Sequence, residues 1–206
     1  MGVLGKTLCG FLLLCSAWSV SAQPLTGLIH SWEKANFLLD GEEQKLAFDA
    51  LLEKAEELRE GGANSPEYLL WAGIIESSYA GEIGGLTALG HAKQAKKDFE
   101  AALDLDPSGV NGAALGSLGT LYSKVPGWPI GFGSAKKARA LFEQAENEGA
   151  NSLDFYIMYA EFALEQNDTM LARRLLDKAA MVPTRPDRQV TDAARHKERK
   201  ALLEVL

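Results

Sequence analysis

The stretch AKKDFEAALDLDP, residues 95–107, determines the fold expected for this chain. Ala95, Phe99 and Ala102 follow one another at i, i+4 and i+7, so their side chains share one face of a helix. The two small residues let a neighbouring helix approach, and the aromatic ring fills the space beside them. Pro107 ends the segment, because proline cannot continue a helix. The stretch therefore predicts a helix that packs closely against a partner along this face.

The same stripe recurs three more times, in FDALLEKA from Phe48, in ALFEQA with its flanking Ala138, and in ARRLLDKAA from Ala172. A further helical segment precedes each stripe. These four segments are Trp32–Leu39, Pro66–Ala80, Val110–Lys124 and Leu153–Gln166. We therefore expect four helical pairs, at about residues 28–62, 66–107, 110–150 and 153–183, and a capping helix at about 187–205 that covers the apolar face of the last pair.

This pattern resembles the tetratricopeptide repeat (TPR) family from about Leu28 to Pro183, most closely in the unit that ends with ALDLDP. The glycine usual in the first helix of such a repeat is present only as Gly119. The resemblance implies an all-α, right-handed α-solenoid of TPR-like helical hairpins, with a concave groove that holds other proteins or peptides.

The two middle pairs each hold seven extra residues between their helices. The extra residues belong to two apolar, glycine-rich stretches, AGEIGGLTALG at Ala80–Gly90 and VPGWPIGFG at Val125–Gly133. Because the loops inside successive hairpins emerge along one edge of a helical stack, we expect the two inserts to be neighbouring loops.

Three interpretations of VPGWPIGFG remain open. Trp128, Ile130 and Phe132 could fold back over the helix ends as a small satellite core, or Trp128 and Phe132 could present rigid apolar area to a peptide or ligand. The third is an anion site at the helix start after Gly131, although Ser134 is more simply an N-cap. The candidate partner-binding or ligand-binding residues are Trp128, Phe132, Ile130, Tyr122, Tyr79 and His91.

Charge is distributed unevenly along the chain. Glu33–Glu67 holds ten acidic and four basic residues, whereas Arg185–Lys200 holds six basic and three acidic residues. The simpler interpretation is that both segments are solvated helical faces. The alternative is that opposite charge brings them into contact, either end to end or with a partner.

Met1–Ala22 has the pattern of a cleaved secretory signal peptide: an apolar run with Lys6 as its only charge, then Val20-Ser21-Ala22. The alternative is a lipoprotein signal with Cys15 as the acylated residue. Cleavage leaves a single domain, residues 23–206, without cysteine, and predicts a periplasmic protein, or a secreted one if the organism has no outer membrane.

Catalytic motifs are absent from the sequence. Its three histidines are not spaced as metal ligands, and it has no nucleophile elbow or nucleotide fingerprint. Residues 23–206 hold 20 basic and 28 acidic side chains, a balance that argues against nucleic acid as a partner. We therefore expect no enzymatic activity, cofactor or metal, and no membrane span in the mature chain.

The sequence thus predicts a non-enzymatic periplasmic scaffold that binds a protein or peptide of the cell envelope through its groove and its two inserts. The combination of export and repeats is also similar to exported bacterial TPR proteins and, more distantly, to the periplasmic T-component of tripartite ATP-independent (TRAP) transporters. That likeness implies the alternative function, a small-molecule-binding accessory of a solute transporter.

Overall fold

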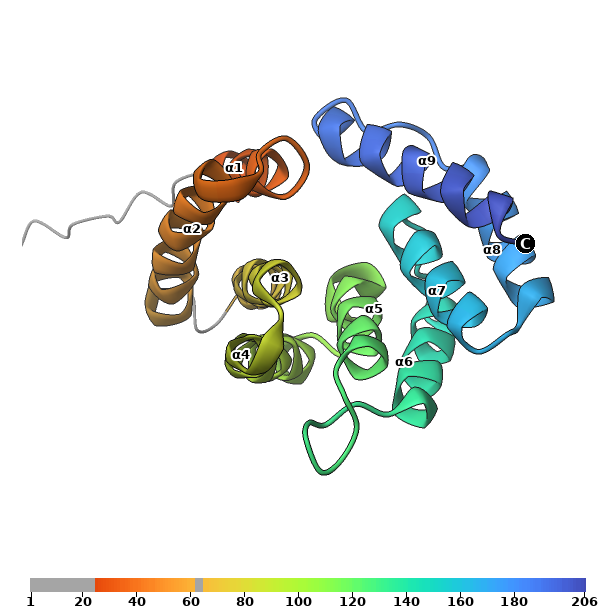
Figure 1. Cartoon of the computed structure of the whole chain (residues 1–206), viewed down its shortest axis with the longest axis horizontal. Coiled ribbons are helices and arrows are strands. Elements are labelled where there is room, and N and C mark those ends of the chain that lie inside the picture. Colours follow the sequence, from red (N-terminus) through yellow and green to blue (C-terminus); the bar gives the residue numbers. More distant parts are fainter. Residues whose placement is uncertain (1–24, 62–64) are drawn as a thin grey trace, which may run out of the picture.

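A computed structural model describes residues 25–61 and 65–206, which fold into helices without any strand (Figure 1). The helices are α1 (Leu25–Phe37), α2 (Gly41–Gly61), α3 (Pro66–Ile83), α4 (Gly85–Leu105), α5 (Gly109–Lys124), α6 (Ala135–Asn147), α7 (Leu153–Glu165), α8 (Thr169–Ala180) and α9 (Gln189–Glu204). The all-α class expected from the stripe is confirmed. The predicted signal peptide, with both cysteines, lies outside the described residues.

Consecutive helices form pairs, α1 with α2, α3 with α4, α5 with α6 and α7 with α8. The odd-numbered helices also contact one another in sequence, α1 with α3, α3 with α5 and α5 with α7. The first helices of the pairs therefore form a continuous row. Within the described ranges, no helix is both long enough and apolar enough to cross a membrane.

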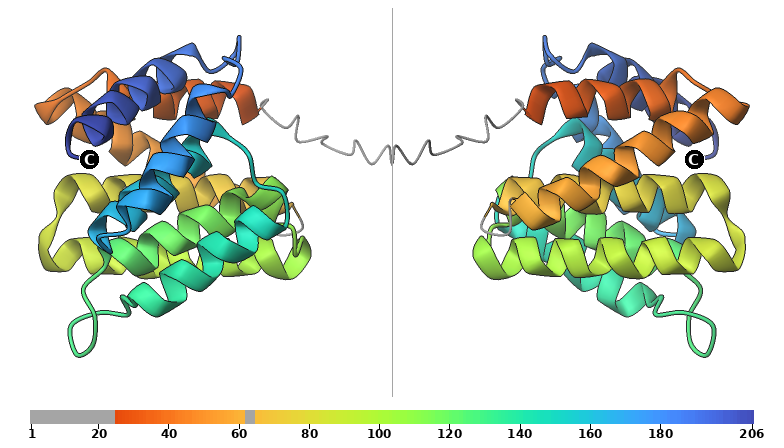
Figure 2. Two further views of the ribbon diagram at one scale, coloured as in Figure 1. Left: turned by 90° about the vertical axis from the view of Figure 1, so that its right-hand side faces the viewer. Right: turned by 90° about the vertical axis from the view of Figure 1, so that its left-hand side faces the viewer.

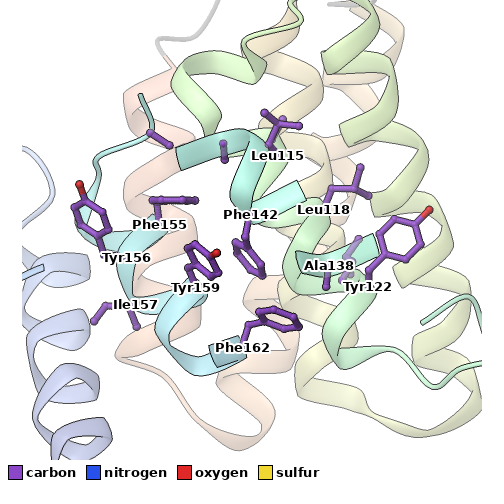
Figure 3. Close-up of a cluster of buried hydrophobic side chains, with 14 of the residues drawn as sticks. Leu115, Leu118, Tyr122, Ala138, Phe142, Phe155, Tyr156, Ile157, Tyr159 and Phe162 are labelled. Atoms are coloured by element: carbon purple, nitrogen blue, oxygen red, sulfur yellow. The ribbon is translucent and has the colours of Figure 1, made fainter. Parts of the chain in front are cut away.

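The repeated stripe forms the contact within each pair. Its fully buried members, each with 0% exposure, are Phe48, Ala55, Ala95, Phe99, Ala102, Ala138, Phe142, Ala145, Ala172, Leu176 and Ala179. Phe142 lies at the centre of a cluster of rings (Figure 3), where it stacks on Tyr159 with 4.8 Å between ring centroids. In the first pair Leu52 is only half-buried, and its neighbour Leu51 is buried instead.

Serine side chains cap the starts of α3 and α6. The Ser65 hydroxyl accepts a hydrogen bond from the Tyr68 amide, and Pro66 occupies the first turn of α3. The Ser134 hydroxyl likewise accepts from the Lys137 amide at 3.3 Å, which confirms Ser134 as the N-cap of α6.

The predicted loop at Ala80–Gly90 is wrong. Helix α3 continues to Ile83 and α4 begins at Gly85, so only Gly84 separates them. Gly84 and Gly85 have φ of 57° and 67°, and this left-handed backbone reverses the chain within two residues. Because the stretch contains no proline, every residue can keep its helical N–H, and the extra residues lengthen the two helices. The stretch Val125–Gly133 contains two prolines and does form a loop.

Helix α9 does more than cover the last pair. It contacts α7 and α8, as a capping helix should, and it also contacts α1 at the other end of the chain. The row of helices consequently closes into a ring, in which the blue α9 comes to lie beside the red α1 (Figures 1 and 2). The opposite charges of the two segments are the only feature of the sequence that pointed to this closure.

Candidate functional site

The ring encloses a cavity of about 850 Å³ between the odd-numbered helices. Its wall is mostly apolar, with side chains from α1, α3, α4, α5 and α7. The large members are Trp32, Leu70, Trp71, Ile74, Leu86, Leu89, Leu121, Phe155 and Met158. The first helices of successive pairs lie side by side. One face of each packs on the stripe of its partner helix, and a face that the partner leaves uncovered forms part of the cavity wall. The cavity is therefore a consequence of the paired architecture.

One part of the cavity wall is charged. Arg185 and Arg188 come from the segment before α9, and Arg195 comes from α9 itself. Asp154 of α7 accepts hydrogen bonds from Arg185 Nη2 and Arg195 Nε, both at 2.9 Å. Burial alone would raise the pKa of Asp154, but the charges of Arg195 and Arg185 outweigh burial and lower it. Asp154 therefore stays ionised and anchors α9 to α7.

The contact between α1 and α9 depends on Glu33, which is only 3% exposed. Its carboxylate accepts hydrogen bonds from Arg188 Nε at 2.8 Å and from the Thr191 hydroxyl at 2.6 Å. The Arg188 guanidinium also lies over the rings of Trp32 and Trp71, 5.9 and 5.3 Å from their centroids. Burial would raise the pKa of Glu33, yet the hydrogen bonds from Thr191 and Arg188 lower it overall. Glu33 and Arg188 thus form a buried ion pair that closes the ring.

The Val125–Gly133 loop is closed at its base by its own backbone. The bonds run from Gly131 N–H to Gly127 O, from Gly133 N–H to Pro126 O and from Ser134 N–H to Tyr122 O, at 3.1, 3.0 and 2.8 Å. The base leaves no room for a side chain at Gly133, where a Cβ would lie 1.8 Å from the Val125 carbonyl oxygen. Glycine is therefore required there by close backbone approach.

Replacing Gly133 with alanine is expected to break the base of the loop and to lower the free energy of unfolding by about 2 kcal/mol or more, as overpacking does. Gly127→Ala is the matched control, because a Cβ at Gly127 would meet only the Gly133 carbonyl oxygen, at an ordinary 3.5 Å. Thermal unfolding of both variants measures the difference. Equal melting temperatures would contradict the backbone clash.

The six candidate residues named from the sequence form two packed groups and the exposed tip of the Val125–Gly133 loop. Phe132 is half-buried and packs edge-on against buried Tyr122, with 5.4 Å between centroids. Trp128 and Ile130 form the tip of the loop and are 89% and 61% exposed. Of the three loop side chains, only Phe132 lies as the satellite-core interpretation requires.

Tyr79 and His91 form the second group, with 4.8 Å between their rings. His91 Nδ1 lies 2.7 Å from Glu76 Oε2, and Glu76 also pairs with Arg59 of α2 at 2.6 Å. His91 is thus part of an ion-pair cluster that joins α2, α3 and α4. The two groups belong to neighbouring pairs, and the loop lies beside α4, where Lys96 Nζ is 6.0 Å from the Phe132 ring centroid. The two stretches thus lie near each other, but only Val125–Gly133 is a loop, so the expected pair of neighbouring loops is not formed.

The three arginines of the cavity were not among the candidate residues from the sequence. The feature of the sequence that could have pointed to them is the excess of basic residues in Arg185–Lys200, together with the excess of acidic residues in Glu33–Glu67. Glu33 and Arg188 belong to these two segments, so opposite charge does join the ends of the chain, within one molecule.

No protein-family model matches the chain, and no curated protein is significantly similar to it. Among the described residues, no group of three or more histidine, cysteine or acidic side chains could hold a metal ion.

Proposed function

We propose that this protein is a non-enzymatic binding protein built from TPR-like hairpins, and that it holds a small, largely apolar molecule in the central cavity. The observation that carries the proposal is the largely apolar cavity of about 850 Å³ inside the ring of helices. Cavities that bind small ligands typically measure roughly 300–1,000 Å³ and combine an apolar wall with a few polar groups.

Closure of the ring favours a small ligand over an extended peptide. A peptide that lies along a concave groove needs that groove to be open along its length, whereas here α9 contacts α1 through Glu33 and Arg188. The small-molecule function, given above as the alternative, therefore has more support than a scaffold that binds a peptide in its groove. A protein partner would have to bind the outer surface.

The arginines supply the polar part of the proposed site. Among the contacts of the described residues, Arg185 Nη1, Arg188 Nη1 and Arg195 Nη2 make no hydrogen bond to the protein. No buried side-chain nitrogen or oxygen in the described ranges lacks a partner, so these three nitrogens reach accessible space. They are donors for an acceptor group on the ligand, which would orient the ligand in the cavity.

The proposed setting is the cell envelope, to which the signal peptide predicted at Met1–Ala22 would export the chain. A binding protein without catalysis fits an accessory of a solute transporter, which is what the likeness to the T-component of TRAP transporters implies.

A cavity-filling variant tests the proposal. Ser117 of α5 lines the cavity and is half-buried, so Ser117→Trp would place an indole in the ligand space. The neutral fluorophore N-phenyl-1-naphthylamine is the probe, because its emission rises in apolar surroundings. Ser117→Trp is expected to weaken probe binding about tenfold or more, a change of about 1.4 kcal/mol per decade.

The matched control is Glu53→Trp, which adds the same ring to the exposed face of α2. Far-UV circular dichroism confirms that each variant is folded. Wild-type protein that does not bind the probe, or equal binding by the two folded variants, would overturn the cavity as the ligand site.

A further inference from the structure

We propose that the Val125–Gly133 loop docks the protein on an anionic lipid bilayer, with Trp128 and Ile130 inserted at the headgroup level. This inference goes beyond the proposed function and does not depend on a ligand in the cavity. The loop projects away from the helices at the bottom of Figures 1 and 2, where nothing else in the described chain covers its tip.

The tip has the composition of a membrane-interface element. Trp128, Pro129 and Ile130 are adjacent and exposed, and no residue from Val125 to Gly133 is charged. Tryptophan is enriched at the boundary between lipid and water, since its ring has both a large apolar surface and one N–H donor. Three exposed apolar residues at a projecting point can enter the interface together.

The backbone of the loop also suits an apolar environment. Pro126 and Pro129 have no N–H, and the N–H groups of Ile130, Gly131 and Gly133 donate to carbonyl oxygens inside the loop. Transfer of a free amide out of water costs several kcal/mol, so these internal hydrogen bonds and the two prolines lower the cost of placing the loop at the lipid boundary.

Basic residues surround the base of this tip. Residues 134–142 follow the loop in sequence and residues 85–97 lie beside it in space, and neither segment contains an acidic residue, although the whole chain has a net charge of −7. Lys96 Nζ lies 6.0 Å from the Phe132 centroid, and Lys137 Nζ lies 5.1 Å from that of Tyr122. The basic side chains of the two segments are Lys93, Lys96, Lys97, Lys136, Lys137 and Arg139. Lys96 is paired with Glu100 and Arg139 with Asp168, so the exposed Lys136 and Lys137 next to the loop carry the argument.

This charge pattern selects the bilayer as the occupant. Anionic headgroups offer a continuous negative surface, against which each nearby lysine gains roughly fivefold in binding. A stable protein interface needs about 800 Å² on each partner, which favours a broad complementary surface over a narrow projecting tip. Ile130 and Leu86 also line the cavity, so docking would bring the cavity entrance close to the lipid.

Co-sedimentation with vesicles tests the proposal. The purified protein is mixed with vesicles of phosphatidylcholine alone, or of phosphatidylcholine with about one-third phosphatidylglycerol, at low and high salt. It is expected to bind the anionic vesicles, to be released by salt, and to bind the neutral vesicles at least tenfold more weakly. Tryptophan emission is expected to shift to shorter wavelength when wild type binds, and not in a Trp128→Ala variant, which keeps the other three tryptophans.

Two double variants and one control assign the contact. Trp128→Ala with Ile130→Ala, and Lys136→Gln with Lys137→Gln, are each expected to lower anionic-vesicle binding about tenfold or more. Met170→Ala with Met181→Ala removes two equally exposed apolar side chains at the ends of α8, and binding should not change. All these positions are exposed, and all four proteins have the same N-terminal segment, so differences in binding report the loop.

The proposal is overturned if wild-type protein does not bind anionic vesicles, or if the tip variant binds them as well as wild type. It is also overturned if the tip variant loses a co-purifying protein while no form of the chain binds vesicles, since the loop would then be a protein-docking site. Binding of N-phenyl-1-naphthylamine should be the same in the Lys136→Gln/Lys137→Gln variant and wild type, because neither lysine lines the cavity, and Ser117→Trp should bind vesicles normally. Failure of one proposal is therefore distinguishable from failure of the other.

Discussion

Phe142→Ala is expected to lower the free energy of unfolding by about 3–5 kcal/mol, the cost typical of a large cavity in a core. Phe142 has no exposed surface and contacts three other rings (Figure 3): Phe155, Tyr159 and Phe162, at 6.3, 4.8 and 5.4 Å between centroids. It lies where α6 meets the first helices of two pairs, so the cavity left by its removal cannot collapse by movement of one side chain. Urea unfolding followed by circular dichroism measures the loss.

Phe132→Ala is the matched control, because it removes the same ring from a half-buried position on the loop. Its expected cost is about 1 kcal/mol, in proportion to the smaller area buried. A loss at Phe142 no greater than that at Phe132 would show that the ring cluster does not hold the pairs together.

Arg188→Ala is expected to lower the free energy of unfolding by about 3 kcal/mol and to release α9 from α1. The change leaves the Glu33 carboxylate buried without its cation, which is more costly than losing a surface pair. It also uncovers the faces of Trp32 and Trp71. Hydrogen exchange should therefore become faster in α1 and α9, while the stripe helices α4 and α6 keep their protection.

Asp49→Asn gives the comparison for this prediction. It breaks the exposed Lys45–Asp49 pair of 3.1 Å, and the expected loss is much smaller than that of Arg188→Ala because water screens the pair. Unchanged exchange in α9 of the Arg188→Ala variant would mean that α9 is held by its contacts with α7 and α8 alone.

The closure is also expected to weaken in acid. The pKa of Glu33 in the folded protein is below its ordinary value of 4.5, so its ion pair contributes stability above pH 4.5. That contribution is lost as the pH falls through the lowered pKa, because the carboxylate must then be protonated. The stability difference between wild type and Arg188→Ala should be largest near neutral pH and should shrink in acid. A difference that does not change with pH would exclude Glu33 as the partner that matters.

Much of the fold could be predicted because it follows from local spacing. The stripes around Phe99 and Phe142 predicted which residues would be fully buried, since a helix places i, i+4 and i+7 on one face whatever surrounds it. Ser134 predicted the start of α6 for the same local reason. The loop at Val125–Gly133 follows from Pro126 and Pro129, which cannot donate helical hydrogen bonds.

The stretch Ala80–Gly90 shows where local reasoning failed. Its glycines suggested a loop, but without proline the helices could continue on both sides, and packing of α3 along α4 outweighed the low helix propensity of glycine. The candidate site was likewise only partly predicted. Trp128 and Ile130 are exposed, as a binding surface requires, whereas Tyr122 and Tyr79 serve mainly as packing partners of Phe132 and His91.

The sequence by itself determined the helices, their pairing and their buried faces, because each depends on residues close together along the chain. Only the tertiary structure decided that the ends meet and enclose a cavity. Glu33 and Arg188 are separated by 155 positions, and whether they meet depends on the small rotation that each pair adds to the one before it. That rotation is the sum of many side-chain contacts between helices, none of which has a signature in the local sequence.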